Sequence, residues 1–230
     1  NFKHRKTLTC LMAKAFAADA EPSAFHRWIA AQEQLPLVVH AWYDNLVTQA
    51  FATRANWGLV QGVTQSEHFG DWVNWLRPDG SVVPTKEFIR DGSGAKAPAE
   101  APQETHQWRT LVYEPLGAAW PASNFIVSDS DYVEVLTEID IQTPIPDIVQ
   151  NIRKERSFIF LGCRFTNQLE RSFARQIMKR SSDTHWAIIE GDLTRNEEKF
   201  LREQNITRID APLADFTSAL AHAAAAAVPA

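Results

Sequence analysis

The residues most able to do chemistry stand where a predicted strand gives way to a predicted helix, in residues 35–51. Residues 37–39 are apolar and mostly β-branched, which favours a strand, and residues 44–51 favour a helix. In open α/β sheets such junctions bind ligands. Trp42 and Tyr43 occupy the tip, where small phosphate-binding or catalytic side chains are usual. The junction is therefore a working site, a modified site or a filled one.

Three histidines offer imidazoles that could accept protons in catalysis. His40 lies just before the strand tip, His106 lies in a polar segment, and His185 opens a later strand. Each is expected to be packed or solvated rather than catalytic, because a base must also lie within reach of a reacting group.

Metal and disulfide chemistry find little support in the sequence. Acidic residues recur from Asp129 to Asp140, but acids early in a helix suit its dipole, so we expect no metal site. Cys10 and Cys163 lie far apart and lack metal-ligand spacing. We expect two reduced, mostly buried thiols and a cytoplasmic protein.

Composition excludes several partner classes. The 230 residues are 45% hydrophobic and 22% charged, and the formal charge of -5 argues against nucleic acid or anionic lipid as a partner. No apolar run approaches the length of a membrane span. We therefore expect a globular chain with no nucleic-acid and no membrane partner.

The elements that must position the junction indicate an α/β fold with a doubly wound, mostly parallel sheet. Strands and helices alternate most clearly in the last third, where "SFIFLG", "HWAIIEG" and "ITRID" are separated by helical segments, one opened by a Thr194–Glu197 capping box. We expect a single domain over residues 1–230, with a small β-rich insertion at 57–83 and a mobile loop at 91–107.

Eight tryptophans are many for a chain of this size. Trp57, Trp72 and Trp75 lie in the expected insertion and could form a surface for a protein partner, although core packing is the simpler interpretation.

The order of motifs resembles the SIR2-like (sirtuin-related) domains of bacteria over roughly Leu35 to Asp210. Their recurring pattern is Thr-Asn-Tyr-Asp, then Lys-Leu-His-Gly, then a helix introduced by Asp-Tyr, then Phe-Ile-Gly and a polar loop. The corresponding stretches here read "HAWYDNLV", "LVYEPLGA", "SDSDYVEV" and "FIFLGCRFTNQLE". The resemblance implies a Rossmann-like fold and a strand with a Gly-rich phosphate loop upstream of Asn1. It implies NAD as the cofactor of an open cleft; in a filled cleft we expect NAD+ to bind weakly or not at all.

Carried over residue by residue, the resemblance implies that both catalytic side chains are replaced. The catalytic Asn falls on Trp42 and the catalytic His on Leu116. Neither side chain can accept a proton. The cofactor-binding residues implied by the resemblance are Tyr43 and Asp44 on the nicotinamide side and Gly162, Cys163 and Arg164 on the ribose side.

Two functions follow from these expectations. The first is a catalytically inactive domain that binds a nucleotide or a protein partner as a regulatory module. The second is an active NAD+ hydrolase or sirtuin-type deacylase that uses replacement residues. We favour the first, and we expect Trp42 to pack on Leu116 near residues 162–165 as a plug.

Overall fold

A computed structural model describes residues 2–16, 20–63, 73–84, 101–121, 123–127 and 145–226. The chain divides into two compact units, unit 1 (Asn1–Val149) and unit 2 (Gln150–Ala230), where we expected a single domain. The fold is mixed α/β with mostly parallel strand pairing, as predicted. The helix expected around residues 128–140 lies outside the described residues.

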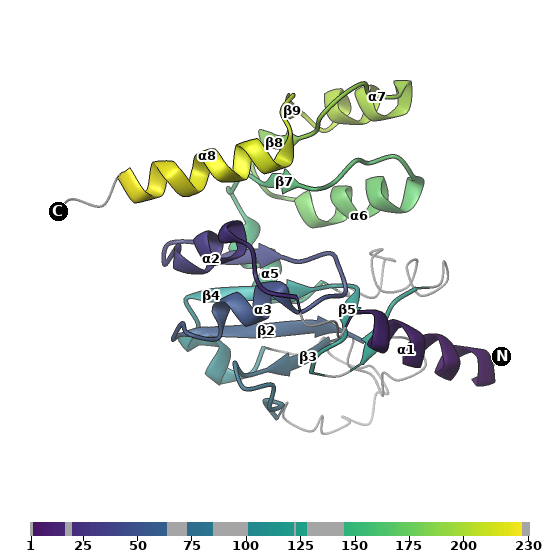
Figure 1. Ribbon diagram of the computed structural model, residues 1–230, viewed down its shortest axis with the longest axis vertical. Helices are drawn as coiled ribbons and strands as arrows, with labels where there is room; N and C mark the ends of the chain where they lie inside the picture. Colours follow the sequence, from purple (N-terminus) through teal and green to yellow (C-terminus); the bar gives the residue numbers. More distant parts are fainter. Residues whose placement is uncertain are drawn as a thin grey trace, which may run out of the picture. The chain divides into compact units, whose positions relative to one another are not determined.

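Unit 1 is built on a four-stranded sheet of order β1-β4-β2-β3 (Figure 1). Its central strands carry residues that are buried along their whole length, which is why they form the middle of the sheet. The β1–β4 and β4–β2 pairs are parallel and the β2–β3 pair is antiparallel. The strands are β1 (Leu37–Val39), β2 (Trp57–Gly62), β3 (Val73–Leu76) and β4 (Thr110–Glu114).

Helices and short elements complete unit 1. Helices α2 and α3 lie side by side (Figure 1). The remaining elements are α1 (Phe2–Phe16), α2 (Ala24–Ala31), α3 (Leu46–Phe51), the 3-10 helix η1 (Gln103–Gln107), β5 (Gly117–Ala118) and β6 (Asn124–Phe125); α5 (Asp147–Arg153) spans the boundary with unit 2.

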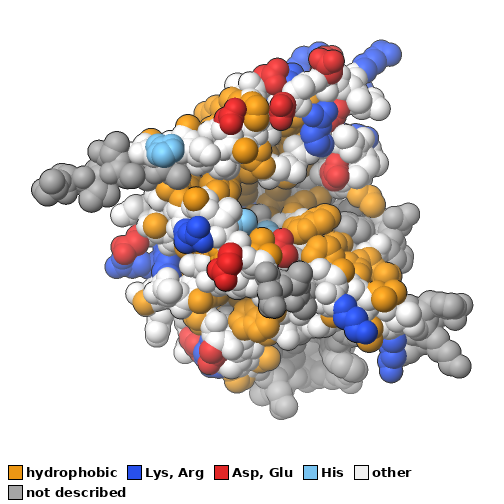
Figure 2. All heavy atoms as spheres, viewed as in Figure 1, with side chains coloured by type: hydrophobic (Ala, Val, Ile, Leu, Met, Phe, Trp, Pro, Cys, Tyr) orange, Lys and Arg blue, Asp and Glu red, His pale blue; other side chains and the backbone are white. Residues whose placement is uncertain are grey.

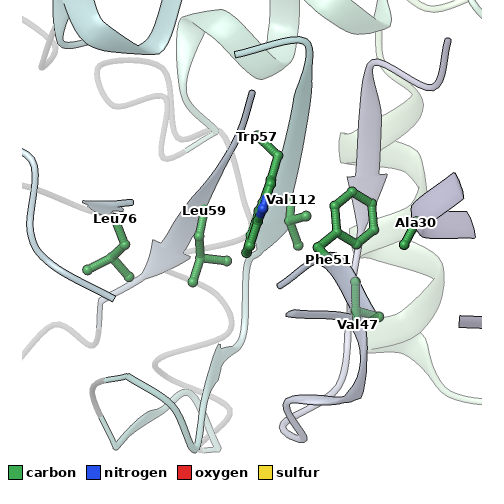
Figure 3. Packing of buried hydrophobic residues seen from close by; sticks show 7 residues of the cluster. All are labelled: Ala30, Val47, Phe51, Trp57, Leu59, Leu76 and Val112. Carbon is green, nitrogen blue, oxygen red and sulfur yellow. The ribbon is translucent and has the colours of Figure 1, made fainter. Parts of the chain in front are cut away.

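The core of unit 1 joins α2 and α3 to the sheet. Figure 3 shows Phe51 of α3 near Trp57 of β2 and Val112 of β4, and the Phe51 and Trp57 ring centroids are 5.4 Å apart. Burial of these large side chains removes much apolar surface from water and stabilises the helix–sheet contact.

One expectation for unit 1 is corrected. Strand β2 is not part of a separate insertion over 57–83, because it pairs in parallel with β4 inside the main sheet. Trp57 and Trp75 are each 1% exposed, which confirms core packing, the simpler of the two interpretations, for these side chains. Trp72 lies outside the described residues.

The loop expected at 91–107 contains the helix η1. Its Thr105 is buried, and Arg77 donates two hydrogen bonds of 2.8 Å to the Glu104 carboxylate, which holds η1 against β3. Mobility of the remaining loop, whose residues up to 100 are outside the described ranges, stays a prediction.

Unit 2 contains a parallel three-stranded sheet of order β7-β8-β9. Phe165 lies between Phe160 of β7 and Phe200 of α7, with ring centroids 5.2 and 5.0 Å away. The alternation predicted for the last third is therefore confirmed. The elements are β7 (Ile159–Leu161), α6 (Gln168–Met178), β8 (His185–Ile188), α7 (Arg195–Glu203), β9 (Ile206–Ile209) and α8 (Leu213–Ala226).

Both cysteines are free, in agreement with the reduced thiols we expected. Cys10 is exposed, so the expectation of burial is wrong for this thiol, and Cys163 is half-buried. No helix within the described ranges is long and apolar enough to cross a membrane.

Candidate functional site

The carboxyl ends of β1, β2 and β4 meet at one edge of the unit 1 sheet because these three strands run parallel. His40 follows β1, and its backbone N–H continues the ladder by donating to Tyr113 O at 2.9 Å. Glu114 is the last residue of β4, and Gln61 is its register partner in β2. The strand geometry thus places three polar side chains at the edge where α/β sheets bind ligands.

These side chains and Asp44 form a connected polar group, which we call the His40 cluster (His40, Asp44, Gln61 and Glu114). His40 Nδ1 lies 3.3 Å from Glu114 Oε1, and His40 Nε2 lies 3.7 Å from Asp44 Oδ1. Gln61 Nε2 donates to Glu114 Oε2 at 2.9 Å and to Trp120 O at 2.9 Å. An imidazole flanked by two carboxylates is held in a fixed orientation.

Glu114 is fully buried, and burial raises the pKa of its carboxyl above the ordinary value of 4.5. Hydrogen bonds from His40 and Gln61 oppose this shift because they favour the charged form. Burial also lowers the pKa of His26 on α2, while the negative charge of Asp44 acts in the opposite direction. Within the His40 cluster, the buried Glu114 carboxyl therefore holds a proton more readily than an exposed carboxyl does.

Asp44 begins the chain segment that leads into α3. Its Oδ1 accepts a hydrogen bond from Leu46 N at 2.8 Å, and 24% of its side-chain surface is exposed. The carboxylate is therefore fixed by the backbone and by His40 on one side. The exposed part can accept hydrogen bonds from a ligand.

Trp42 does not fill a closed pocket in unit 1. Its surface is 54% exposed, whereas Leu116 is only 7% exposed. The indole contacts the ring of Phe16 in α1, with centroids 5.8 Å apart, and the ring of Tyr43, with centroids 5.5 Å apart. The expectation that Trp42 is a plug is wrong for this reason. A contact with residues 162–165, which belong to unit 2, stays a prediction.

Tyr43 is buried and serves as a structural anchor. Its hydroxyl donates to Ile126 O at 2.8 Å, and its backbone carbonyl accepts from Ala119 N at 2.9 Å. The Tyr43 ring also meets the Phe125 ring edge-on, with centroids 5.7 Å apart. These contacts fasten the strand-to-helix junction to β6 and to the segment after β5.

The turn "EPLG" leaves no proton acceptor at its third position. Gly117 has φ +72°, and a Cβ there would stand 1.9 Å from Asn124 O, so only glycine fits between β5 and β6. The neighbouring Leu116 carbonyl accepts from Ile126 N at 2.9 Å. Leu116 is thus held in a β-ribbon with an apolar side chain facing the interior.

The unit 2 loop that follows β7 holds the other predicted cofactor residues. Gly162 has φ +71°. A Cβ added to Gly162 would lie 3.7 Å from the nearest atom outside the adjoining residues, so a side chain would have space there. Burial, assisted by the Glu170 carboxylate, raises the pKa of Cys163 to about 11, so this thiol is protonated at neutral pH. It is a poor nucleophile in that form.

Each of the three nitrogens of the Arg164 guanidinium has a structural partner. It donates to Glu190 O at 2.6 Å, to Asp192 O at 2.9 Å and to Glu197 Oε1 at 3.3 Å. These bonds tie the loop after β7 to the loop before α7. An Arg164 arranged in this way supports the shape of a site more directly than it binds a phosphate.

The other two histidines have local structural roles. His185 Nδ1 accepts from Phe158 N at 3.0 Å, and its burial lowers its pKa. His106 Nδ1 lies 3.2 Å from Gln103 O within η1. His185 is therefore packed and His106 is solvated, which agrees with the expectation that each is packed or solvated.

Sequence reasoning missed the partnership of His40 with Glu114 and Gln61. These residues are 74 and 21 positions from His40 along the chain, and only the parallel pairing of three strands brings them together. A usable signal existed, because His40 and Glu114 each stand at the end of an apolar run. Among the described residues no group of three His, Cys, Asp or Glu side chains could hold a metal ion.

Comparison with known proteins gives one family match. The family described as "SIR2-like domain" matches residues 36–209, which include the His40 cluster, the "EPLG" turn and the loop after β7. No curated protein matches the sequence.

Proposed function

Because this chain belongs to the SIR2-like domain family, we propose that it binds a nicotinamide nucleotide at the carboxyl edge of the unit 1 sheet without turning it over. The observation that carries this proposal is Leu116. It occupies the position where the resemblance places the catalytic His, is 7% exposed, and has no atom that can accept a proton. The resemblance likewise places Trp42 at the position of the Asn that would orient the ribose.

The described residues fit the nicotinamide part of such a ligand. Asp44 presents an oriented and partly exposed carboxylate that can accept hydrogen bonds from a carboxamide. Arg164 uses three of its five N–H groups to shape the loop after β7 within unit 2. Binding through the nicotinamide end is therefore the mode that these contacts support.

A regulatory module of this kind would report nucleotide levels to a protein partner. Such a role needs binding and a change in contacts, and it needs no proton transfer. Both cysteines are free, which is consistent with our proposal of a reducing cytoplasm as its compartment.

The proposal is tested by measuring binding and turnover on the same preparation. We expect calorimetry to detect NAD+ binding and chromatography to detect no nicotinamide above a blank. Asp44→Ala should weaken binding about 10- to 150-fold, because a hydrogen bond to a charged group contributes about 1.5–3 kcal/mol. Glu33→Ala, an exposed carboxylate on the segment after α2, is the matched control and should bind as the wild type does.

The His40 cluster favours a second candidate function, hydrolysis of NAD+ at the nicotinamide–ribose bond. An imidazole between two carboxylates has the properties of a general base, and it stands at the ligand-binding edge. In the turnover assay, nicotinamide release that is lost in His40→Gln and kept in His106→Gln would establish this function in place of the first.

A further inference from the structure

A cleft in unit 1 lies at the amino ends of the parallel strands, at the opposite edge of the sheet from the His40 cluster. Asn56 directly precedes β2 and Arg109 directly precedes β4, and both residues line this cleft. The five residues of β4 separate the two edges by roughly 13 Å, because a strand rises about 3.3 Å per residue. One small ligand at the cleft therefore does not reach the His40 cluster.

The cleft has a volume of about 480 Å³, which is in the range of sites that bind small molecules. Part of its lining consists of alanines, whose short side chains leave the space open and offer apolar contact. These residues are Ala30 and Ala31 of α2, Ala50 of α3, and Ala55. The cleft can therefore hold the apolar part of a ligand.

Charged side chains form another part of the lining, and we call the cleft the arginine pocket after them (Arg27, Glu33, Arg54 and Arg109). Three guanidinium groups and one carboxylate leave a formal charge of +2, whereas the whole chain carries a formal charge of -5. Figure 2 shows basic side chains on α2 and close to it, beside acidic ones. The pocket is thus a cationic region on an acidic chain and attracts anions.

Arg54 is the fixed cation of the arginine pocket. Its two terminal nitrogens donate to three backbone carbonyls of residues 30–33 and to Thr110 Oγ1, the last at 2.6 Å. Burial lowers the pKa of Arg54, the Glu33 carboxylate opposes this shift, and the positive charge of Arg109 adds to it. A bound anion would relieve the repulsion between the two guanidinium groups.

Arg27 and Arg109 keep hydrogen-bonding capacity for such an anion, and both are exposed. Arg27 donates from Nη1 to Pro22 O. Within the described ranges, the charged partner of Arg109 is the Glu33 carboxylate at 3.9 Å, which is too long for a hydrogen bond. Because a guanidinium has five N–H donors, both arginines can bind an oxyanion through paired N–H groups.

We propose that the arginine pocket binds a phosphate monoester of a small apolar molecule, with the phosphate on Arg27 and Arg109 and the apolar group on the alanines. A phosphate monoester carries a charge of about -1.5 to -2 at neutral pH, which matches the charge of the pocket better than a single carboxylate does. This site is separate from the nucleotide site that we propose at the carboxyl edge, and neither proposal depends on the other.

Calorimetry on the full chain tests the ligand class, with phenyl phosphate as the probe. We expect phenyl phosphate to bind with a Kd of about 1 mM or less, and benzoate, which has the same ring and one negative charge, to bind about tenfold more weakly. Equal affinity for the two would overturn the assignment to a phosphate monoester. Absence of phenyl phosphate binding at about 10 mM would overturn the site itself.

Variants of the exposed arginines locate the binding. Arg27→Gln and Arg109→Gln should each weaken phenyl phosphate binding about 10- to 150-fold, the range for a hydrogen bond to a charged group. Arg109→Lys keeps the charge without the paired donors and should lose less affinity than Arg109→Gln. Arg195→Gln removes an exposed arginine of α7 in unit 2, and this matched control should bind as the wild type does.

Ala31→Leu tests the apolar part of the pocket. Ala31 is exposed at the end of α2, where leucine is a good helix former, so the variant should fold. The larger side chain should weaken phenyl phosphate binding about fivefold or more and leave the weaker binding of inorganic phosphate unchanged. Unchanged affinity for phenyl phosphate would overturn the placement of the apolar group on the alanines.

Two further comparisons separate this site from the proposed nucleotide site. Asp44→Ala should leave phenyl phosphate binding unchanged, and Arg109→Gln should leave NAD+ binding unchanged. Phenyl phosphate binding that persists in both arginine variants, or that falls equally in Arg195→Gln, would overturn the arginine pocket and leave the proposed function intact. Loss of NAD+ binding in Arg109→Gln would mean that the two sites are not separate and would also overturn the inference.

Discussion

At the scale of single residues, two buried glutamates show how surroundings give one side chain opposite tasks. Glu114 has a raised pKa because burial outweighs its hydrogen bonds, whereas the pKa of Glu197 is lowered. Burial also opposes the charge on Glu197, but bonds from Thr194 and Arg164 more than compensate. The Glu114 carboxyl can hold a proton at the edge of the sheet where a ligand would bind. The Glu197 carboxyl is an anion that hydrogen bonds hold in place within unit 2.

Glu114→Gln tests the raised pKa. A carboxyl whose pKa is higher in the folded protein binds more protons when folded, so its contribution to stability falls as pH rises from 4.5 through the folded pKa. Glutamine is nearly isosteric and does not titrate. In urea titrations, we expect the free energy of unfolding of Glu114→Gln minus that of wild type to increase from pH 5 to pH 8.

A matched control isolates burial as the cause. Glu33 is an exposed carboxylate, so Glu33→Gln should follow the wild-type dependence on pH. Parallel curves for Glu114→Gln and wild type would show that the Glu114 carboxyl titrates normally.

At the scale of elements, local patterns predicted more of the fold than of the site. The Thr194–Glu197 capping box was readable because its residues are three apart, and the structure confirms it with Glu197 N donating to Thr194 Oγ1 at 3.3 Å. The alternation of strands and helices in unit 2 was readable for the same local reason. The capping box at Asn167–Glu170 of α6 escaped notice although it has the same spacing.

Pairing between distant segments could not be read in this way. The run at 57–62 looked like an insertion because neither its length nor its composition shows which strand it joins, and its parallel pairing with β4 spans about fifty residues. The edge-on contact of Phe16 with Trp42 and the bond of His40 with Glu114 depend on such pairings. The sequence therefore predicted that the candidate site lies at the strand ends, but it did not predict the contacts between distant residues that build the site.

Glu197→Gln tests the capping network of α7. The wild-type carboxylate accepts from Thr194 N at 2.8 Å and from Arg164 Nε at 3.3 Å. Its lowered pKa means that its stabilisation is fully present above the ordinary value of 4.5 and is lost as pH falls through the folded pKa. We expect a loss of about 2 kcal/mol at pH 7, since bonds to charged groups contribute about 1.5–3 kcal/mol.

Urea unfolding at pH 7 and pH 3 measures this difference. The difference in the free energy of unfolding between Glu197→Gln and wild type should be smaller at pH 3 than at pH 7. Ser218→Ala, on an exposed position of α8, is the control and should leave stability nearly unchanged at both pH values. A gap that stays constant would mean that the bonds to Glu197 do not depend on its charge.

At the scale of the whole molecule, each unit has its own buried aromatic core. Phe51 and Trp57 anchor the sheet of unit 1, and Phe165 and Phe200 anchor the sheet of unit 2. The family match, to residues 36–209, includes parts of both units. Stability, however, can still be distributed unit by unit, because a domain-sized unit with its own core can open separately.

Hydrogen exchange on the intact chain tests this distribution. Phe51 and Phe200 are 0% and 1% exposed, and replacing a buried Phe by Ala costs about 3–5 kcal/mol. Phe51→Ala should therefore speed exchange of the backbone amides in β2 and β4 while those in β8 and β9 keep their protection. Phe200→Ala should produce the reverse pattern. If either variant instead lost protection in both sheets to the same extent, the two cores would be parts of one cooperative structure, and nucleotide binding at the edge of unit 1 would then stabilise β8 and β9 equally.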